Sequence, residues 1–460
     1  MNLPNPLVSA CLARPRHPAL ETADGVLTWS ELLGRVRARA ATWTGQVEPG
    51  HRVALHGPAA AAWVEAFHAL GVLGASVAPL PARGTVAELA SAMRAVGARW
   101  AVSTATGVGL EAVQAAARAA EVPWLRAGES SGGDETERAW PLEEERVVLR
   151  TSGTTGEARA IALTTGQLVF SAFGSAVRHG LSPDDRWLAC LPLDHVGGLS
   201  ILVRSAFYGT TVVLHDGFDA ARVDAALRGR DGVTLLSLTP SMVEQLLDTR
   251  PDFRFDPRVR LALVGGAETS PALEARLRAL GAPVALTWGM TEAASQLTSR
   301  RLDALEGRGV GAPLPFTRVE VDVDERLVVS GPTVVGGRHT TSDLGSVEPD
   351  GQVWVRGRAD DVIVTGGAKV DPAEVEAVLS LHPAVREVAV LGRTDAHWGE
   401  RLVACVVGDA DRVAEVEAHC RAHLSPHKCP KAWIWREALP RNTLGKLDRR
   451  ALRRSLEEGR

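Results

Sequence analysis

Short apolar runs alternate with longer amphipathic stretches from about residue 51 to residue 290. Runs rich in β-branched residues predict strands, and apolar positions at helical spacing predict helices between them. The expected strands cover residues 52–56, 100–104, 147–150, 187–191, 211–215, 233–238, 261–264 and 284–287, and the expected helices include 59–70, 167–179 and 220–228. Strands that alternate with helices predict an α/β fold whose mostly parallel sheets are covered by helices on both faces.

The pattern changes in the last third of the chain. Short β-rich pieces are expected at 319–323, 327–330 and 352–356, followed by helices at 372–381 and 410–423 and strands at 387–392 and 401–407. We therefore predict a large N-terminal domain with a β-rich subdomain, then a small α+β C-terminal domain, with the boundary near Arg358. Residues 127–146, rich in Ser, Gly and acidic side chains, are expected to form a surface loop.

Composition narrows the classes of partner. The 460 residues carry a formal charge of −4, which gives no reason to expect nucleic acid or an anionic membrane. No apolar run of about 18 residues and no signal-peptide pattern occur, so we expect no membrane span and no secretion. The five cysteines are scattered without a CxxC pair, which favours a cytoplasmic protein.

Lysine is rare in this chain. Only four of the 51 basic residues are lysines, namely Lys369, Lys428, Lys431 and Lys446. A solvated positive charge can be carried by lysine or arginine, but the two differ in donor geometry. Each lysine therefore either occupies a position that requires an ammonium group or has been retained by chance on a basic surface.

A loop rich in hydroxyl groups and glycine follows the expected strand at 147–150. It reads Thr151, Ser152, Gly153, Thr154, Thr155 and Gly156. Glycines let the backbone turn sharply, and hydroxyl and N–H groups suit phosphate oxygens. The loop lacks the Gly-Lys-Ser/Thr ending of a Walker A motif. Taken alone, it predicts either a phosphate-binding loop or an ordinary connection.

Six further segments place polar groups in apolar surroundings: LPLDHVGGL at 191–199, GGAE at 265–268, WGMTE at 288–292, TSDLG at 341–345, GRADD at 357–361 and RNTLGK at 441–446. With the loop at 151–156, their order and spacing resemble the adenylate-forming superfamily of acyl-CoA synthetases and luciferases. The resemblance runs essentially from end to end.

This resemblance implies a two-step reaction with ATP, Mg²⁺ and CoA. A carboxylate attacks the α-phosphorus of ATP, giving an acyl-adenylate and pyrophosphate, and a thiol then attacks the activated carbonyl. The implied catalytic residues are Lys446, Glu292 and Thr155, with Glu292 and Thr155 holding the metal. The implied nucleotide-binding residues are Thr151–Gly156, Arg159, Gly266, Ala267, Glu268, Trp288 on adenine, Gly289, Met290, Thr291, Asp343 on the ribose hydroxyls, and Arg358.

The resemblance also implies domain motion between the half-reactions. It gives an ATP- and acyl-binding domain at 1–357, a hinge at 358–361 that includes Asp360, and a mobile domain at 362–460. Lys446 would face the site during adenylation, and Gly366, Gly367 and Lys369 would face it during attack by CoA. Two residues depart from the family pattern: Arg159 replaces a usual lysine, and Ser342 replaces a usual glycine.

The segment LPLDHVGGLSILVRS at 191–205 resembles one subfamily, the o-succinylbenzoate–CoA ligases of menaquinone biosynthesis, although Asp194 stands where phenylalanine is usual. That substrate carries two carboxylates, and the one that is not activated needs donors or a cation when it is desolvated. The expected acyl-site residues are His195, Gly197, Gly198, Arg204, Gly289 and Ser295. Arg204 is either such a cation or a residue on a helix surface.

Two alternatives stay open. The chain could be a CoA ligase for another aryl or medium-chain acid, differing only in its acyl pocket. It could also be a non-catalytic nucleotide-binding relative or an adenylation module that loads a carrier protein, which the lack of an appended carrier domain disfavours. The expected partners are a small carboxylic acid, ATP and CoA, with a homo-oligomer possible.

Overall fold

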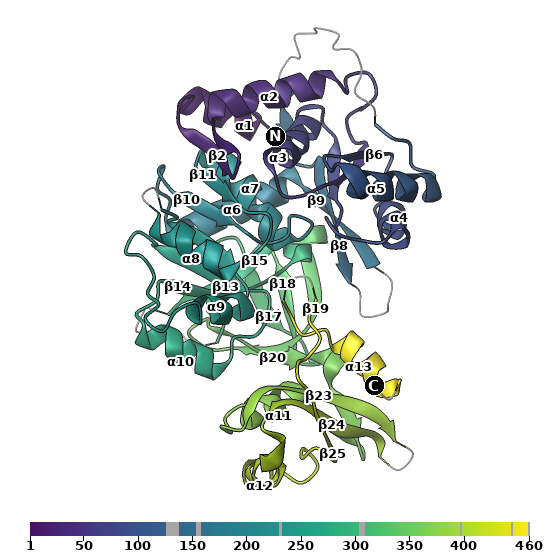
Figure 1. Cartoon of the computed structure of the whole chain (residues 1–460), viewed down its shortest axis with the longest axis vertical. Helices are drawn as coiled ribbons and strands as arrows, with labels where there is room; N and C mark the ends of the chain where they lie inside the picture. The colour runs from purple at the N-terminus through teal and green to yellow at the C-terminus, as the bar shows by residue number, and fades with distance from the viewer. Residues whose placement is uncertain are drawn as a thin grey trace.

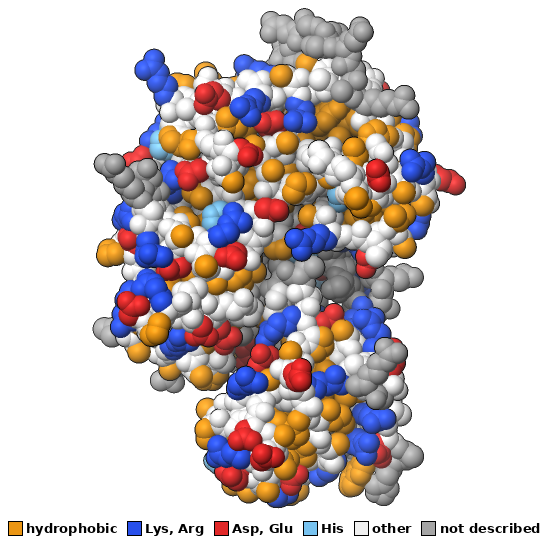
Figure 2. Space-filling model, viewed as in Figure 1, with side chains coloured by type: hydrophobic (Ala, Val, Ile, Leu, Met, Phe, Trp, Pro, Cys, Tyr) orange, Lys and Arg blue, Asp and Glu red, His pale blue; other side chains and the backbone are white. Residues whose placement is uncertain are grey.

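The computed structural model describes residues 1–125, 138–152, 158–229, 232–302, 309–395, 398–442 and 445–458. It is an α/β protein with a large N-terminal part and a smaller C-terminal part at the lower end of Figure 1, as the sequence predicts. Basic and acidic side chains are interspersed over both parts on the face seen in Figure 2. Among the described helices, none combines the length and apolar character needed to cross a bilayer.

Nine of the described strands form the largest sheet, in which the middle strands are parallel and the edges are antiparallel. Its order is β16 (Ala312–Pro313), β15 (Ser295–Arg301), β14 (Val284–Met290), β13 (Leu261–Gly265), β12 (Leu235–Leu238), β10 (Arg186–Ala189), β11 (Thr211–Leu214), β2 (Pro18–Thr22) and β3 (Gly25–Thr28). The parallel strands are short and mostly apolar, and β11 and β12 are buried throughout, as expected for strands covered on both faces.

Five described strands form a second sheet in the N-terminal part. Its order is β6 (Trp100–Ser103), β4 (Arg52–His56), β5 (Ser76–Pro79), β8 (Glu145–Ser152) and β9 (Ala158–Thr164). All of its neighbouring pairs are parallel except β8 and β9, which form an antiparallel hairpin.

Helices cover both sheets and fill the space between them. Side chains of α3 (Ala61–Val72), α6 (Thr165–His179) and α7 (Val196–Tyr208) share one core with residues of both sheets, and α1 (Pro6–Ala13) and α2 (Trp29–Ala41) pack onto it. Helices α8 (Ala220–Arg228), α9 (Pro240–Leu247) and α10 (Pro271–Ala279) cover the outer face of the larger sheet, and α4 (Val86–Ala95) and α5 (Gly107–Ala119) cover that of the smaller. The acyl-site candidates Gly197, Gly198 and Arg204 on α7 therefore lie in the middle layer, and Gly289 and Ser295 lie on the large sheet.

The β-rich stretch and the C-terminal part follow in order. Strands β17 (Arg318–Val321), β18 (Arg326–Ser330), β19 (Arg338–Val347) and β20 (Val353–Arg358) form an antiparallel sheet. The C-terminal part contains β21 (Ile363–Thr365), β22 (Ala368–Val370), α11 (Pro372–Leu379), β23 (Val385–Asp395), β24 (Gly399–Gly408), α12 (Val413–His423), β25 (Ala432–Trp435) and α13 (Arg449–Glu457). The division into domains at 357 and 361 stays a prediction.

The sequence pattern finds most buried strands but misses others. The expected strand at 52–56 and helix at 220–228 match β4 and α8. The hairpin of β2 and β3 and the strands β5, β9, β15 and β19 were not expected, because they are short or mix polar and apolar residues. The surface loop expected at 127–146 is wrong in its described part, since β7 (Trp140–Pro141) pairs with β1 (Asn2–Leu3) and Arg146 is buried.

Candidate functional site

The expected phosphate loop follows β8 and precedes β9 in the sequence. Thr151 is the register partner of Arg159, and the Arg159 side chain is exposed. Gly153, Thr154, Thr155 and Gly156 lie outside the described residues, as do the side chains next to them. The structure therefore positions the two ends of the loop, and the role of Thr155 in catalysis and metal binding stays a prediction.

Lys446 projects from the C-terminal part against the large sheet. A Cβ atom at Gly266, which has a φ of +83°, would lie 3.2 Å from Lys446 Cε and 3.6 Å from its Nζ, so glycine leaves the space that the lysine fills. The turn is held from both sides: Lys446 N donates to Asn442 Oδ1 at 3.1 Å, and Ser241 Oγ donates to the Gly445 carbonyl at 3.2 Å. Gly266 leads into the exposed residues Ala267 and Glu268 after β13.

Asp343 and Arg358 face Lys446 from neighbouring strands. They are register partners on β19 and β20, with Arg358 Nε 3.9 Å from Asp343 Oδ1. Burial raises the pKa of Asp343, and the Trp288 hydrogen bond, Arg358 and Lys446 oppose that rise. Burial and the charge of Arg358 lower the pKa of Lys446, whereas Asp343 raises it. The arrangement is a carboxylate and two cations grouped at the contact between the two parts of the chain.

Trp288 supports Asp343. Its ring is 8% exposed and packs into the core of the β-rich stretch, and its Nε1 donates to Asp343 Oδ2 at 2.8 Å. This contact orients the carboxylate. The stacking of Trp288 on adenine stays a prediction.

The strand carrying Trp288 ends in an irregular turn. The pairing of β14 with β15 shifts between Trp288 and Gly289, and a Cβ atom at Gly289 would lie 1.8 Å from the Ser295 carbonyl oxygen. Met290 ends β14, and Thr291 and half-buried Glu292 lie in a short 3-10 helix. Ala294 and Ser295 have φ values of +52° and +105°, which are costly for residues other than glycine.

The strained residues adjoin Glu292, the expected metal ligand, and include Ser295, an expected acyl-site residue. The described residues contain no group of three or more His, Cys, Asp or Glu side chains that could hold a metal by themselves. Mg²⁺ is commonly bound by one or two carboxylates together with substrate phosphates, so a single Glu292 suits that donor set.

The segment before α7 forms the second expected part of the site. His195 is the residue preceding α7, and its Nε2 lies 4.0 Å from Asp194 Oδ2. Burial lowers the pKa of His195, Asp194 raises it, and Lys446 lies near enough to lower it. Gly198 is required by space, because a Cβ atom there would lie 2.3 Å from the Pro192 carbonyl oxygen. At Gly197 a Cβ atom would make only an ordinary contact with Leu191.

Arg204 is buried on α7, so the helix-surface alternative is wrong. Its side chain is 2% exposed, its Nη2 donates to Ser171 Oγ at 3.2 Å, and its guanidinium lies 5.9 Å from the centre of the Trp187 ring. Within the described residues it has no carboxylate partner, and its Nε is buried without a hydrogen bond. Burial lowers its pKa. An unpaired buried cation is costly, and a bound anion would offset that cost. The role of Arg204 in the acyl site stays a prediction.

Arg204 borders a cavity of α6, α7 and the small sheet, here named the Arg204 cavity. Ser171 Oγ also donates to the Ala294 carbonyl at 2.6 Å, so the cation is connected to the strained turn. The lining residues are Leu149, Leu163, Leu168, Ser171, Val196, Leu199, Ser200, Val203, Arg204 and Ala294. Ser171 and Ala294 are not among the expected site residues; the signal for Ser171 is a hydroxyl group on one face of an apolar helix, and Ala294 has none.

The residues expected to serve CoA lie apart from Lys446 along the chain. Gly366 and Gly367, with φ values of +56° and +80°, form the turn between β21 and β22, and a Cβ atom at Gly366 would lie 2.9 Å from the Trp398 ring. The Lys369 side chain is exposed, and its ammonium group has no hydrogen bond or ion pair with any described residue. Asp360 lies in a 3-10 helix (Ala359–Asp361), with its Oδ2 3.6 Å from Arg358 Nη2. Their roles stay predictions.

Comparison with known proteins places these features in context. The profile of the AMP-binding enzyme family matches residues 8–359, and that of the AMP-binding enzyme C-terminal domain matches residues 374–446. A 2-succinylbenzoate–CoA ligase from Bacillus cereus is 34% identical over 490 residues, covering 99% of each chain.

Solved structures also resemble this chain over nearly its whole length. The o-succinylbenzoate coenzyme A synthetase of Bacillus subtilis, in complex with ATP and magnesium ion, is 29% identical with a TM-score of 0.87, covering 99% of this chain and 100% of that one. A double mutant of that synthetase, bound with its product analogue OSB-NCoA, is 29% identical and gives a TM-score of 0.71, covering 100% and 99%. This chain therefore superposes better on the ATP-bound arrangement.

Proposed function

Because the chain belongs to the AMP-binding enzyme family, we propose that it is an ATP-dependent acid–thiol ligase that joins o-succinylbenzoate to CoA through an acyl-adenylate. The choice of o-succinylbenzoate as substrate rests on Arg204. Its guanidinium is buried beside the strained turn at 294–295 and has no carboxylate partner among the described residues. A dicarboxylic acid supplies both groups that such a site needs: one carboxylate for activation and a second to neutralise Arg204.

The charges of the reactants and of the site residues indicate how the substrate carboxylate would be activated. In the first half-reaction two anions, the substrate carboxylate and the α-phosphate, must approach each other. The Lys446 ammonium beside Gly266 lies in the group of charges that would screen this repulsion and stabilise charge developing at phosphorus. Asp343, held by Trp288, would accept hydrogen bonds from the ribose hydroxyls. Glu292 would hold Mg²⁺, which supplies charge neutralisation of the phosphates.

The second half-reaction requires a different surface beside the acyl group. Transfer to the CoA thiol would follow after the C-terminal domain turns about the segment at 358–361 and brings the Gly366–Gly367 turn and Lys369 to the site. The exposure of Lys369 and of the turn supports their being free to make new contacts.

A release assay tests the substrate and the acceptor together. Pyrophosphate release would be measured with o-succinylbenzoate, substituted benzoates and short fatty acids, each with and without CoA. We expect the highest kcat/KM with o-succinylbenzoate and a thioester product only when CoA is present. Faster pyrophosphate release with a monocarboxylic acid would refute o-succinylbenzoate as the substrate. Pyrophosphate release without thioester formation in the presence of CoA would refute CoA as the acceptor.

A further inference from the structure

Two buried arginines each donate a hydrogen bond to a hydroxyl group on helix α6. Arg146 donates from Nε to Thr165 Oγ1 at 3.1 Å, and Arg204 donates from Nη2 to Ser171 Oγ at 3.2 Å. The two arginines are 3% and 2% exposed. Because the two pairs have the same chemistry, they differ in what each hydroxyl group contacts next.

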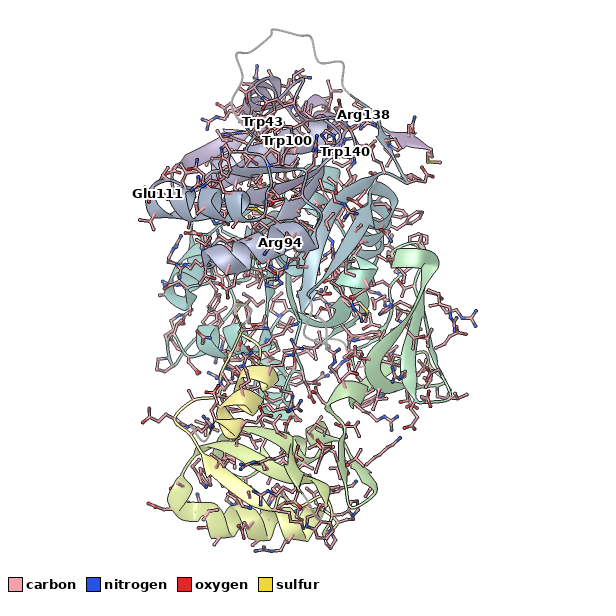
Figure 3. All side chains as sticks on the ribbon, turned by 90° about the vertical axis from the view of Figure 1, so that its right-hand side faces the viewer. Trp43, Arg94, Trp100, Glu111, Arg138 and Trp140 are labelled. Carbon is pink, nitrogen blue, oxygen red and sulfur yellow. The ribbon has the colours of Figure 1, made fainter. Side chains whose placement is uncertain are left out.

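Arg146 belongs to a network that stabilises the N-terminal part. Its Nη2 pairs with Glu144 at 2.8 Å, and Glu144 pairs with Arg138 at 2.6 Å. The Arg146 guanidinium lies 4.3 Å from the centre of the Trp140 ring. Thr165 Oγ1 completes the network by donating to the Glu144 carbonyl at 3.4 Å. Figure 3 shows Arg138 and Trp140 at the end of the molecule opposite the C-terminal part, so this network lies away from Lys446 and its neighbours.

The Ser171 hydroxyl group instead contacts a segment of the expected site. Its Oγ donates to the Ala294 carbonyl at 2.6 Å, and Ser171 is 5% exposed. A guanidinium only donates and a carbonyl only accepts, so the single hydroxyl proton points to Ala294 while a lone pair of Oγ accepts from Arg204. The buried cation therefore fixes the direction of the hydroxyl group, and it polarises that group as a donor.

Ala294 connects this hydrogen bond to the turn that carries Glu292. The φ values of Ala294 and Ser295, +52° and +105°, persist only where the surrounding structure holds them. The Ala294 amide donates to the Thr291 carbonyl at 3.1 Å and closes the short 3-10 helix that contains Glu292. Ser171 thus holds the carbonyl of a residue whose amide fixes the helix of the expected metal ligand.

We propose that Ser171 is a positioning residue for adenylation, which keeps the turn at 291–295 in its strained conformation and thereby keeps Glu292 in place. The proposal rests on the proposed reaction, although not on the identity of the acid. Loss of the hydroxyl group would leave the Ala294 carbonyl and an N–H group of Arg204 without this partner, and the strained turn would relax. Since Arg204 is retained, the chemical step would suffer more than binding of the acid.

The kinetic test compares Ser171→Ala with Thr165→Val by pyrophosphate release. In Ser171→Ala the kcat of adenylation should fall about tenfold or more, because small misplacements of reacting groups are costly, while the KM for the acid should change less than about threefold. Ser171→Thr keeps the hydroxyl group and should restore most of the rate. Alanine is a good helix former, so the fold should be retained, as circular dichroism would check.

Thr165→Val is the matched control, because it removes the equivalent hydroxyl group from the Arg146 network. It should lower the Tm and leave kcat unchanged. Equal losses of kcat in Ser171→Ala and Thr165→Val would overturn the proposal, because they would show a general effect of losing a buried hydroxyl group. A rate as low in Ser171→Thr as in Ser171→Ala would also overturn it.

Hydrogen exchange supplies a second measurement, which needs no substrate. Amides at 291–296 of the full-length protein should exchange about tenfold faster in Ser171→Ala than in the wild type, and at the wild-type rate in Thr165→Val. If the wild type does not turn over o-succinylbenzoate, the proposed substrate fails, and the kinetic comparison is made with the acid that gives the fastest release. Unchanged exchange or an unchanged kcat in Ser171→Ala would contradict the role of Ser171 with either acid.

Discussion

Two cations, the buried Arg204 and the half-buried Lys446, contrast the N-terminal part of this molecule with the C-terminal part, which we expect to move. Arg204 lies on α7 in the middle layer of the N-terminal part, inside the core shared by both sheets. Lys446 lies on a turn of the C-terminal part, and its described neighbours across the contact, Gly266 and Asp343, belong to the other part of the chain. One charge lies in the core of the N-terminal part, and the other reaches across from the C-terminal part.

The different placement of the two cations suits two tasks, recognition of the acid by Arg204 and assistance of a single half-reaction by Lys446. A cation fixed in a packed core can recognise one anion at one distance, because its surroundings cannot rearrange without loss of packing. A cation on a docked turn can leave when the contact opens, so it can serve one half-reaction and be absent from the next. We expect substitutions of Arg204 to change which acid is used, and substitutions at Lys446 or the hinge to change which step is lost.

The largest expected effect is at Lys446. Lys446→Ala and Lys446→Arg should each lower the adenylation rate on the order of 10²-fold or more, because a planar guanidinium does not replace a compact ammonium between carboxylate and phosphate. Pyrophosphate release measures this step. Thioester formation from synthetic acyl-adenylate and CoA should survive in both variants.

The matched control is Lys428, another of the chain's few lysines, whose Nζ lies 2.6 Å from Glu374 in an exposed ion pair. Lys428→Arg should leave both steps unchanged. Full adenylation activity in Lys446→Arg would refute the requirement for lysine, even if the alanine variant were inactive.

A smaller effect, confined to the other step, is expected at Asp360. Proline fixes φ, so Asp360→Pro should restrict rotation about the segment at 358–361 and lower the rate of thioester formation about tenfold or more, with adenylation less affected. Both half-reactions would be timed separately by rapid quench.

Asp360→Ala is the control, because it removes the carboxylate near Arg358 but leaves the backbone free. Equal losses in the two steps of Asp360→Pro would contradict the hinge.

The smallest effect is expected at Trp288, in the part of the expected ATP site that the N-terminal part provides. Trp288→Phe keeps an aromatic ring but removes the N–H that donates to Asp343, so the KM for ATP should rise about threefold to tenfold. Burial raises the pKa of Asp343 and this hydrogen bond opposes the rise, so its loss should raise that pKa further. On acidification, ATP binding should therefore weaken at a higher pH than in the wild type. An unchanged pH profile would mean that Trp288 does not support Asp343.

The sequence predicted the repeating core but not every strand. Apolar runs such as β11 and β12 are buried on both faces and stand out from their flanks. Strand β19 holds Thr341, Ser342 and Asp343, which we expect to serve the site, and these polar residues hide its strand character. Strand β15, paired on both sides near the edge of the large sheet, mixes Ser, Gln, Thr and Arg with one leucine, so it lacks a clear apolar run.

The site was predictable as a set of motifs rather than as a geometry. Glycines next to functional residues were visible in the sequence, but only the structure relates Gly266 to Lys446, residues 180 positions apart. The sequence of α7 does not reveal that Arg204 is buried. This helix is buried on nearly all sides, so it has no polar face, and without one the sequence does not show which way the arginine points.

The most direct test of the fixed-cation account is the substrate preference of Arg204→Met. Pyrophosphate release would be measured with o-succinylbenzoate and with 4-oxo-4-phenylbutanoate, the same acid without its aryl carboxylate. Methionine keeps much of the volume and removes an unpaired buried charge, so the fold should be retained, as circular dichroism would check. The account predicts that the KM for o-succinylbenzoate rises about 10²-fold, as for loss of a buried charge pair, while that for the analogue changes less than about threefold. A similar change for both acids would contradict it.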